Sequence, residues 1–387
     1  MSTIIIIDWI LYISLASCVA YLLFYAIASC FYHLPHFPKA LMNRRFAVLF
    51  PAYKEDRIII KSVQRFLEQE YPKELFDIIV ISDQMLPETN ETLEQLPIRL
   101  LKADYTDSSK AKALNLAVDA MEKEAYEIIV IMDADNVTTP YFLTEVNRSF
   151  DSGLQAVQAR RTGKNLNTDI AILDSVSEEI NNSIFRSGHN AIGLSASLSG
   201  SGMAFDADWF KQNVRSLKTA GEDKELETLL LKQRIHTGYL QYLPVYDEKT
   251  QKADAIKHQR KRWIAAQFDA LSSVLPDFPK ALLRGNIDYC DKILQWMLPP
   301  RLLQLAGVFM ITLIVAIISP WDAAIKWYVL SGAQIAAMLL AIPRTLFNKR
   351  LLKAVMQLPL LAFAMAGNLF KLKGVNKKFI HTEHGSD

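Results

Sequence analysis

The sequence predicts an α/β protein in which a doubly wound, mostly parallel sheet is flanked by transmembrane and interfacial helices. Short apolar runs rich in β-branched residues alternate with helical patterns between residues 46 and 131. This alternation is typical of a parallel sheet with helices on both faces. Hydrophobic residues make up 51% of the chain, and they are concentrated at its two ends, which indicates segments that lie in a membrane.

The composition narrows the class of protein. The chain has 387 residues, 43 basic and 41 acidic side chains, so it has room for one sizeable domain and lacks the basic surplus of a nucleic-acid-binding protein. Its three cysteines are Cys18, Cys30 and Cys290. An odd number without a pairing pattern argues against a disulfide scaffold and favours a reducing compartment. From the apolar ends we expect membrane lipids among its partners, and from the balanced charge we expect no nucleic acid.

The first apolar segment, Trp9 to Tyr32, carries no charged residue. About 20 apolar residues suffice to cross a bilayer as a helix, so a buried core helix is the weaker interpretation. No basic residue precedes the segment, unlike a signal peptide. Lys39, Arg44 and Arg45 follow it, and the positive-inside rule then puts the N-terminus outside and the next domain in the cytoplasm.

The α/β part begins after this basic flank. We expect strands at 46–50, 76–82, 98–102 and 128–131, and helices at 58–68 and 110–123. In an open α/β sheet, ligands bind beyond the carboxyl ends of the strands. The sequence therefore predicts a ligand crevice that collects Pro51 to Glu55, Asp83, and Asp133 to Asp135 at one edge of the sheet.

Asp133 and Asp135 directly follow the buried strand at 128–131. Residues i and i+2 of an extended chain point the same way, so the two carboxylates would share one target. Mg²⁺ or Mn²⁺, bound together with diphosphate oxygens, is the natural target of such a pair. An acidic turn at a strand end is the plain alternative, and a lone Asp-x-Asp would favour it.

Six motifs in order turn this pattern into a family resemblance. They are Phe50-Pro-Ala-Tyr-Lys-Glu55, Ile81-Ser-Asp83, Lys110-Ala-Lys-Ala-Leu-Asn115, Asp133-Ala-Asp135, Gly221-Glu-Asp223 and Gln259-Arg-Lys-Arg-Trp263. Together they resemble the membrane-bound family 2 glycosyltransferases with a GT-A fold, which include cellulose, chitin, hyaluronan and poly-N-acetylglucosamine synthases and ceramide glucosyltransferase. Each motif alone is unspecific, whereas the ordered set is specific. The resemblance covers about residues 46–270 and the flanking membrane segments.

Two positions depart from the family pattern. Ser82-Asp83-Gln84 stands where the family has Asp-Asp-Gly, and Ser109 stands where it has a glycine before the lysine.

The resemblance implies a nucleotide-sugar donor, most simply a UDP-sugar. Pro51, Tyr53 and Glu55 would belong to the loop around the nucleoside, and Asp83 would hold the uracil by accepting its imide N–H. A turn-capping aspartate is the alternative for Asp83. Lys110 would face the diphosphate as a point charge; a solvated helix lysine is the alternative interpretation, with Lys112 nearby as a second candidate.

The resemblance also divides the roles of the acidic groups. Asp133 would lie near the ribose or sugar and the metal, and Asp135 would bind the metal, Mg²⁺ or Mn²⁺, which offsets charge on the departing UDP. Asp223 would be the general base, with Glu222 beside it, because inverting transfer needs one base for the acceptor hydroxyl proton. Acidic residues also favour the first turn of any helix, which is the structural alternative for Glu222 and Asp223.

Gln259, Arg262 and Trp263 match the Gln-x-x-Arg-Trp motif, which the resemblance places at the acceptor. Arg262 could bind phosphate bidentately, and Trp263 offers a flat face to a sugar ring. A basic helix lying on the membrane is the alternative, and it explains Arg260 and Lys261.

Two intervening stretches receive weaker interpretations. Residues 153–182 look mixed and polar, with a strand at 155–161. Residues 195–205 are rich in serine, glycine and alanine, which lets backbone approach a ligand closely, and the family has its acceptor site here. A mobile surface loop is the alternative for this second stretch.

The sequence divides into five parts. We expect a transmembrane helix and basic flank at 1–45, the cytoplasmic GT-A domain at 46–270, interfacial amphipathic helices at 271–301, transmembrane helices at 302–372, and a cytoplasmic-type tail at 373–387. The last apolar stretch, 351–372, either crosses the membrane, re-enters or lies in the interface, because its crossing would put four lysines outside.

These features predict an integral membrane glycosyltransferase, in the inner or plasma membrane, that moves a sugar with inversion from a nucleotide-sugar to a hydroxyl of a glycan or lipid acceptor. Synthesis of an extracellular or cell-surface polysaccharide is the first hypothesis, and single transfer to a lipid is the alternative. A catalytically silent membrane scaffold is the rival from another class. The sequence names neither the sugar nor any partner subunit.

Overall fold

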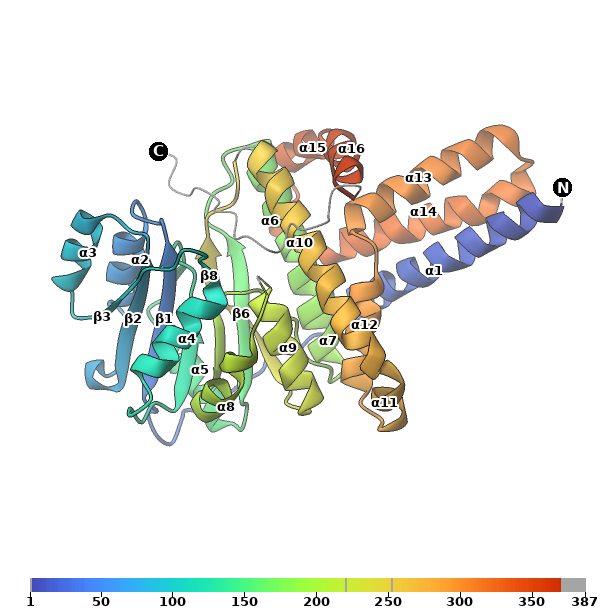
Figure 1. Ribbon diagram of the computed structural model, residues 1–387. Helices are drawn as coiled ribbons and strands as arrows, with labels where there is room; N and C mark the ends of the chain where they lie inside the picture. The colour runs from blue at the N-terminus through green and yellow to red at the C-terminus, as the bar shows by residue number, and fades with distance from the viewer. Residues whose placement is uncertain (1, 220, 252, 370–387) are drawn as a thin grey trace.

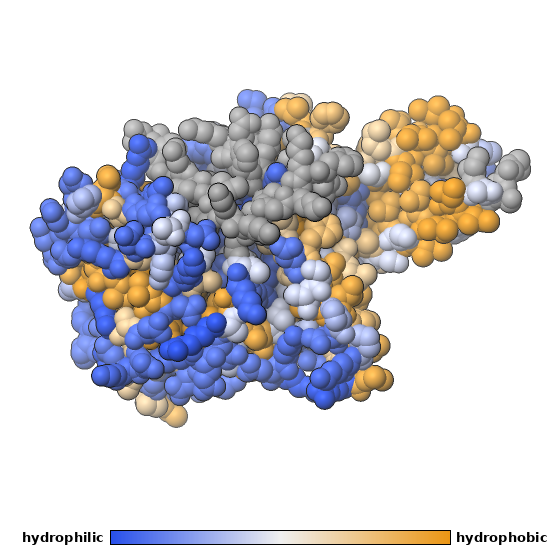
Figure 2. Space-filling view, in the orientation of Figure 1, coloured by the Kyte–Doolittle hydropathy of each residue, from blue (hydrophilic) through white to orange (hydrophobic). Residues whose placement is uncertain are grey.

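The computed structural model describes residues 2–219, 221–251 and 253–369. An α/β body carries the sheet, and three long helices project together from one side of it (Figure 1). Figure 2 shows polar residues over most of the α/β body and apolar residues over the projecting helices. The expected division into an α/β body and apolar helices is therefore present in the structure.

The described residues form one sheet of eight strands in the order β3-β2-β1-β4-β7-β6-β8-β5. The pairs β3–β2, β2–β1, β1–β4 and β6–β8 are parallel, whereas β7 runs antiparallel to both β4 and β6, and β5 antiparallel to β8. The predicted α/β class is confirmed, and the antiparallel pairs lie in the second half of the sheet. The strands are β1 Phe46–Tyr53, β2 Phe76–Asp83, β3 Arg99–Ala103, β4 Ile128–Ile131, β5 Val137–Thr138, β6 Ala156–Gly163, β7 Met203–Asp206 and β8 Thr237–Asp247.

Strand β1 shows why both faces of the sheet are covered. Phe46, Val48 and Phe50 belong to one core, and Ala47 and Leu49 belong to the other, because successive side chains of a strand point to opposite faces. Residues of α2 and α5 complete the first core, and residues of α4 and α8 complete the second. The bounds of the surrounding helices are α2 Ile59–Phe66, α3 Pro87–Glu94, α4 Lys110–Ala120, α5 Phe142–Asp151, α8 Ala207–Asn213 and α9 Glu222–Lys232.

One helix contradicts the sequence interpretation. The stretch described as mixed and polar contains α6, Asp169–Asn182, which continues into a π-helical turn, Ser183–Ser187, and α7, Gly188–Ala191. Thr168 caps α6 by accepting a hydrogen bond from the backbone N–H of Ala171 at 3.1 Å. The helix has no clear apolar stripe because buried polar side chains such as Glu178 and Glu179 take part in its packing. Their partners come from other elements, so the periodicity rule does not apply.

Three described helices are long and apolar enough to cross a membrane, over Ile5–Cys30, Arg301–Ile318 and Trp321–Ala341. They lie in α1 Ser2–Cys30, α13 Arg301–Ile318 and α14 Trp321–Ala341, as the sequence predicts. The doubtful fourth segment is broken into α15, Lys349–Val355, and α16, Leu358–Leu369, whose axes differ by 42°. The tail predicted at 373–387 lies outside the described residues.

Lys326, a basic residue inside α14, has an acidic partner in α1. Lys326 forms an ion pair with Asp8 of α1, and the indole N–H of Trp327 donates to the same carboxylate at 2.9 Å. The Lys326 ammonium group also lies 3.9 Å from the centre of the Trp9 ring. An ionisable group among apolar helices needs such partners, so this lysine is compatible with a membrane segment.

Helices α11, Phe278–Leu283, and α12, Ile287–Met297, follow the long helix α10, Ala253–Val274. One side of them is buried against α9 and α10 through residues such as Cys290, Ile293 and Trp296. Other apolar side chains are exposed, among them Leu283 and Ile287. This two-sided character fits the interfacial helices that the sequence predicts, and contact with a bilayer stays a prediction.

Helix α1 is also joined to the α/β body at Tyr25. The Tyr25 hydroxyl donates to Asp291 of α12 at 2.6 Å, and Nε2 of His189 lies 2.9 Å from the same carboxylate. The Tyr25 and His189 rings stack with centroids 3.8 Å apart. Gly188 permits this approach, because a Cβ atom there would overlap the Tyr25 carbonyl oxygen.

Gly188→Ala should therefore loosen helix α1 from the α/β body. The overlap involves backbone atoms that cannot rotate away, so we expect a loss of stability of about 1–3 kcal/mol. Gly332→Ala in α14 is the matched control, since nothing lies within 4 Å of its added methyl group, and it should stay within about 1 kcal/mol of the wild type. Melting midpoints in detergent test this, and equal midpoints for both variants would contradict the packing role of Gly188.

Candidate active site

A polar crevice of about 230 Å³ lies beyond the carboxyl ends of β1, β2 and β4. Helices α4, α9 and α10 complete its walls. All twelve residues that the sequence singled out line this crevice, although they come from six separate stretches of the chain. They are Pro51, Tyr53, Glu55, Asp83, Lys110, Asp133, Asp135, Glu222, Asp223, Gln259, Arg262 and Trp263.

Asp83 ends β2 with a buried carboxylate, which is 3% exposed. Its Oδ1 atom has no hydrogen-bond partner among the described residues. Burial raises the pKa of this carboxyl group, and a hydrogen bond from Ser108 opposes the rise. A turn-capping role would engage the carboxylate with backbone N–H groups, so it does not explain this acceptor. A buried acceptor without a partner indicates a place for a ligand or an ordered water.

The two departures from the family pattern have local explanations. Gln84 stands at a glycine position and adopts a left-handed φ of 54°, where its side-chain amide donates to the Tyr105 carbonyl at 2.9 Å. Ser109 caps α4 by accepting from the backbone N–H of Lys112 at 3.2 Å. Neither substitution removes the turn or the helix start that the crevice needs.

Lys110 is the centre of the crevice. Its ammonium group lies 2.6 Å from Asp133 Oδ1, 2.6 Å from the Gly200 carbonyl oxygen and 3.4 Å from Glu222 Oε1. Burial alone would lower the pKa of Lys110, but the two carboxylates raise it above its usual value. Lys112 is exposed and does not line the crevice. The interpretations of Lys110 as a solvated charge and of Lys112 as its substitute are therefore wrong.

The extended geometry expected for Asp133 and Asp135 is also wrong. The chain turns after β4, with the Asn136 N–H donating to the Asp133 carbonyl at 3.1 Å. Asp135 is buried and accepts from the backbone N–H of Glu248 at 2.7 Å and from the Asn136 amide at 3.1 Å. The two carboxylates thus have different partners, because a turn and not a strand joins them, although both line the crevice.

The crevice fits a divalent cation that is shared with a substrate. Among the described residues, no group of three His, Cys, Asp or Glu side chains is arranged to hold a metal ion by itself. Mg²⁺ is usually bound by one or two carboxylates together with substrate phosphates. Each carboxylate oxygen has two lone pairs, so Asp135, whose two oxygens each accept a hydrogen bond, also has the capacity to bind a cation.

Glu222 and Asp223 begin α9, and both side chains line the crevice. Glu222 is buried, and burial raises its pKa to about 7; Lys110 opposes this rise and Asp223 adds to it. Asp223 is half-buried, and its Oδ1 atom accepts from the N–H of Lys224 at 2.9 Å. The acidic first turn therefore faces the crevice, which the helix-dipole explanation alone does not require.

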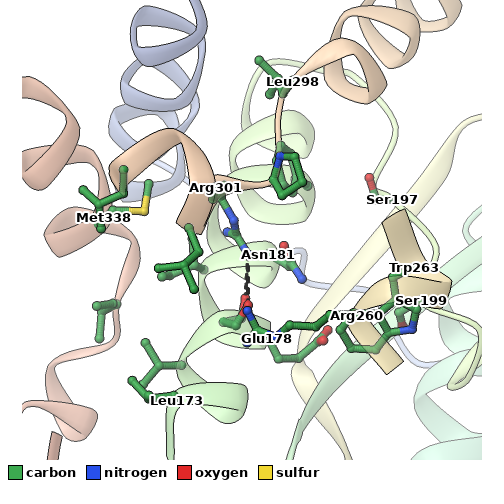
Figure 3. Close-up of a pocket in the computed structure, with 18 of the residues that line it drawn as sticks. Leu173, Glu178, Asn181, Ser197, Ser199, Arg260, Trp263, Leu298, Arg301 and Met338 are labelled. Carbon is green, nitrogen blue, oxygen red and sulfur yellow. Dashed lines mark hydrogen bonds between the residues drawn. The ribbon is translucent and has the colours of Figure 1, made fainter. Parts of the chain in front are cut away.

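A second cavity of about 690 Å³ adjoins the crevice. It is lined mostly by apolar residues of α6, α13, α14, α15 and α16, and we call it the apolar cavity (Figure 3). The two cavities meet where five residues line both of them. The shared residues are Arg161, Ser199, Asp223, Lys224 and Trp263.

Helix α10 separates the two cavities. Its residues 259, 262, 263 and 266 line the crevice, and its residues 260, 263, 264 and 267 line the apolar cavity. Both sets follow the i, i+3, i+4, i+7 spacing of one helical face. Trp263 belongs to both faces and is 40% exposed. The interpretation of this stretch as a helix lying on the membrane is wrong for Arg260, which points into the protein (Figure 3).

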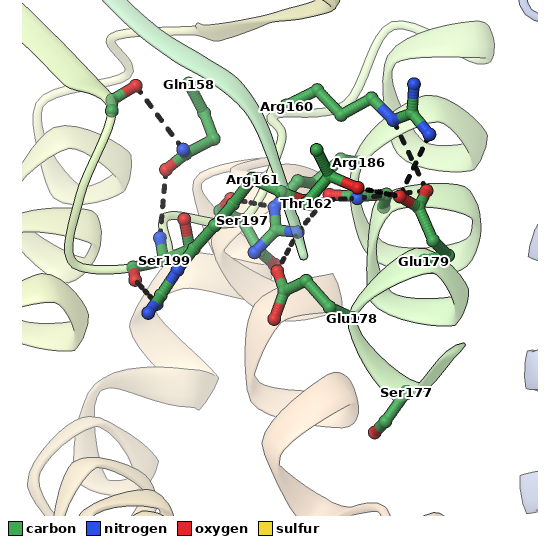
Figure 4. A network of polar contacts seen from close by, with 12 residues as sticks. Gln158, Arg160, Arg161, Thr162, Ser177, Glu178, Glu179, Arg186, Ser197 and Ser199 are labelled. Carbon is green, nitrogen blue, oxygen red and sulfur yellow. Dashed lines mark hydrogen bonds and ion pairs between the residues drawn. The ribbon is translucent and has the colours of Figure 1, made fainter. Parts of the chain in front are cut away.

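Sequence reasoning missed the residues that hold the serine-rich stretch. Arg161 donates to Asp247 at 2.8 Å and to the Ser199 carbonyl at 2.9 Å. The buried Gln158 accepts from the Ser199 N–H at 2.9 Å and donates to the Ser201 carbonyl at 2.9 Å (Figure 4). The stretch is therefore held on several sides, and the mobile-loop interpretation is wrong. The available signal was an arginine pair inside a predicted strand, where charge is unusual.

The fold and the crevice define a class of protein, namely an α/β protein with a charged crevice at the carboxyl ends of its parallel strands. The chain belongs to the family described as glycosyltransferase like family 2, whose sequence model matches residues 43–266. Two curated relatives are the beta-monoglucosyldiacylglycerol synthases of a Nostoc species and of Trichormus variabilis. Each is 24% identical over 310 residues, which cover 77% of this chain and 58% of the relative.

The chain thus spans little more than half the length of these relatives. A solved mannosyltransferase from Pyrobaculum calidifontis, in complex with GDP-Man and Mn²⁺, superposes with a TM-score of 0.58 at 18% identity. The superposition covers 93% of this chain and 98% of that one. This likeness confirms the GT-A fold.

Proposed function

We propose that this family member is an integral membrane enzyme that transfers one sugar, with inversion, from a nucleotide-sugar to the hydroxyl group of a lipid. The observation that carries the proposal is the junction of the two cavities at Asp223 and Trp263. A lipid whose chains lie in the apolar cavity would present its head group to the crevice there. The two relatives, both named as glycolipid synthases, support the same acceptor class.

We assign the donor to the polar crevice. The unpartnered Asp83 Oδ1 atom would accept an N–H of the base, with Pro51, Tyr53 and Glu55 around the nucleoside. Lys110 would lie beside the diphosphate. A uracil base offers the imide N–H that such a carboxylate needs, so a UDP-sugar is the donor that this geometry favours.

The displacement itself needs few protein groups. The acceptor oxygen would form a bond to the anomeric carbon as the bond from that carbon to the nucleoside diphosphate breaks, and Asp223 would take the hydroxyl proton. Arg262, Gln259 and Trp263 would position the acceptor and donor at the wall that α10 forms. Asp223 suits the task because it alone of the acidic residues lining the crevice also lines the apolar cavity among the described residues.

A divalent cation would be held by Asp135, with Asp133 near it, and would neutralise negative charge on the diphosphate. Mg²⁺ and Mn²⁺ both suit carboxylate and phosphate oxygens.

Product analysis tests the acceptor class. Membranes containing the protein are incubated with labelled UDP-sugars, and the label is separated into extractable lipid and polymer. We expect a lipid carrying a single sugar. A polymer would support the polysaccharide hypothesis in place of this one, and no transfer with any nucleotide-sugar would favour the silent scaffold.

The metal assignment predicts that Asp135→Asn loses transfer and that excess EDTA stops the wild type. Asparagine is preferred to alanine because its carbonyl can still accept from the Glu248 N–H, so the fold should survive. Binding of Mn²⁺ in the presence of UDP, followed by electron paramagnetic resonance, should weaken in the variant. Full activity in EDTA would remove the metal from the mechanism.

The base assignment predicts a difference between two neighbouring carboxylates. Asp223→Asn keeps the shape and removes the basicity, so kcat should fall by roughly a hundred- to ten-thousandfold. UDP binding should change little, because the nucleotide would lie on the other side of the crevice. Glu222→Gln should lower kcat much less, since this carboxylate is buried against Lys110. The opposite ranking of the two variants would assign the base to Glu222.

We also propose that the α/β body lies in the cytoplasm and the N-terminus outside, from the basic residues that follow the first membrane helix. Lys218 is exposed, so Lys218→Cys in a background without the three native cysteines is a suitable reporter. It should react with an impermeant thiol reagent only in broken cells. Labelling in intact cells would reverse the orientation.

A further inference from the structure

Two arginines in the apolar cavity have no carboxylate in direct contact among the described residues. Arg260 comes from α10 and Arg301 from the first turn of α13, and both line the cavity (Figure 3). Arg260 Nε and Arg301 Nη1 are shut off from solvent and have no hydrogen-bond partner among the described residues. No ion pair between described residues includes either guanidinium group.

The groups that these two arginines contact are uncharged. Arg301 Nη2 donates to the backbone carbonyl of Ser177 at 3.0 Å, and its guanidinium carbon lies 5.7 Å from the centre of the Phe185 ring. Arg260 Nη1 lies 3.5 Å from the sulfur of Met365. None of these contacting groups carries a negative charge. Asp174 acts on Arg260 and Glu178 acts on Arg301 only from beyond ion-pair distance.

A third arginine in the same cavity, unlike these two, is paired with a carboxylate. Arg186 is paired with Glu178 at 2.9 Å and donates to the Ser197 carbonyl at 3.0 Å (Figure 4). The Glu178 carboxylate is therefore the ion-pair partner of Arg186. Buried charges are normally paired because their desolvation is costly, so the two remaining arginines need an anion that the described residues do not supply.

The cavity limits what this anion can be. A guanidinium group binds a phosphate through two parallel N–H donors, and two such groups suit one phosphate. Most of the remaining lining is apolar, with residues such as Leu173, Leu302, Met338 and Leu361, so the anion must carry a hydrocarbon part. Neither arginine lines the polar crevice, so the diphosphate of a donor bound there is not the missing partner.

We propose that the apolar cavity selects an anionic lipid as acceptor, with its phosphate between Arg260 and Arg301 and its free hydroxyl group at Asp223. This inference rests on the proposed function and adds the chemical class of the acceptor. A neutral lipid would fill the apolar part of the cavity and leave both cations without a partner.

Lipid binding in neutral detergent, without donor, tests the inference directly. The probes are phosphatidylglycerol and diacylglycerol with identical acyl chains, both of which carry a free hydroxyl group, and inorganic phosphate as competitor. We expect the wild type to bind phosphatidylglycerol roughly ten- to a hundredfold more tightly than diacylglycerol, since a hydrogen bond to a charged group is lost with the neutral lipid. Inorganic phosphate at millimolar concentration should not displace it, whereas displacement would identify a free phosphate site and overturn the lipid assignment.

The double variant Arg260→Gln, Arg301→Gln should lose this preference and keep its affinity for diacylglycerol. Arg344→Gln is the matched control, because Arg344 is exposed and does not line the cavity, and it should behave as the wild type. Folding is checked by melting. Phosphatidylglycerol should raise the midpoint of the wild type and the control, and it should not raise that of the double variant. Equal binding of both lipids by the wild type, or a preference that survives in the double variant, would overturn the proposal.

Transfer assays with the same two lipids separate the two levels of inference. Preferred transfer to phosphatidylglycerol supports both. Equal transfer to both lipids would overturn the anionic acceptor and leave the glycosyltransferase function standing. A binding preference without transfer to any lipid would overturn the acceptor role and, with it, the proposed function, while the anion site itself would stand.

Discussion

The contacts of Lys110 are the interaction on which the rest of the site depends. One ammonium group joins the start of α4, the turn after β4, the loop at Gly200 and the first turn of α9. These segments are separated by up to about a hundred residues in sequence, and three of them bring negative charge or a carbonyl oxygen to the same point. Without the cation, the half-buried Asp133 and the buried Glu222 would lose the positive charge that lies between them, and like-charge repulsion would disfavour their approach. Lys110 therefore stabilises the acidic crevice.

The second constraint is the sharing of one helix by two chemically different cavities. Helix α10 gives polar and aromatic residues to the crevice on one face and Arg260, Ile264 and Gln267 to the apolar cavity on the next. Since Trp263 lies where the faces meet, the helical repeat itself puts a flat ring at the border of a polar and an apolar cavity. In the proposed function, this explains physically how a motif of five residues would contact both the donor and a lipid acceptor.

The three long apolar helices are positioned by polar contacts as well as by apolar ones. Asp8 with Lys326 joins α1 to α14, and Tyr25 with Asp291 joins α1 to α12. Such pairs have few competing partners in an apolar environment. They hold α1 against both the helical bundle and the α/β body, and the apolar cavity lies between the bundle and that body.

The amino-acid sequence by itself determined the strands β1, β2 and β4, the apolar helical spans and the crevice residues at the ends of those strands, because local apolar periodicity and the carboxyl-edge rule of α/β sheets need no knowledge of distant contacts. The sequence singled out the other crevice residues only through the resemblance of their motifs to a known family; these are Lys110, Glu222, Asp223, Gln259, Arg262 and Trp263. It failed at α6, whose buried Glu178 and Glu179 obscure the helical period, and at Asp135, where a turn replaces the extended geometry. Only the tertiary structure decided which charges are paired. Lys110 and Arg260 look alike in sequence, as basic residues in helices, yet Lys110 contacts two carboxylates and Arg260 has no ion pair among the described residues. Pairing depends on elements that approach from far along the chain, so no local pattern records it.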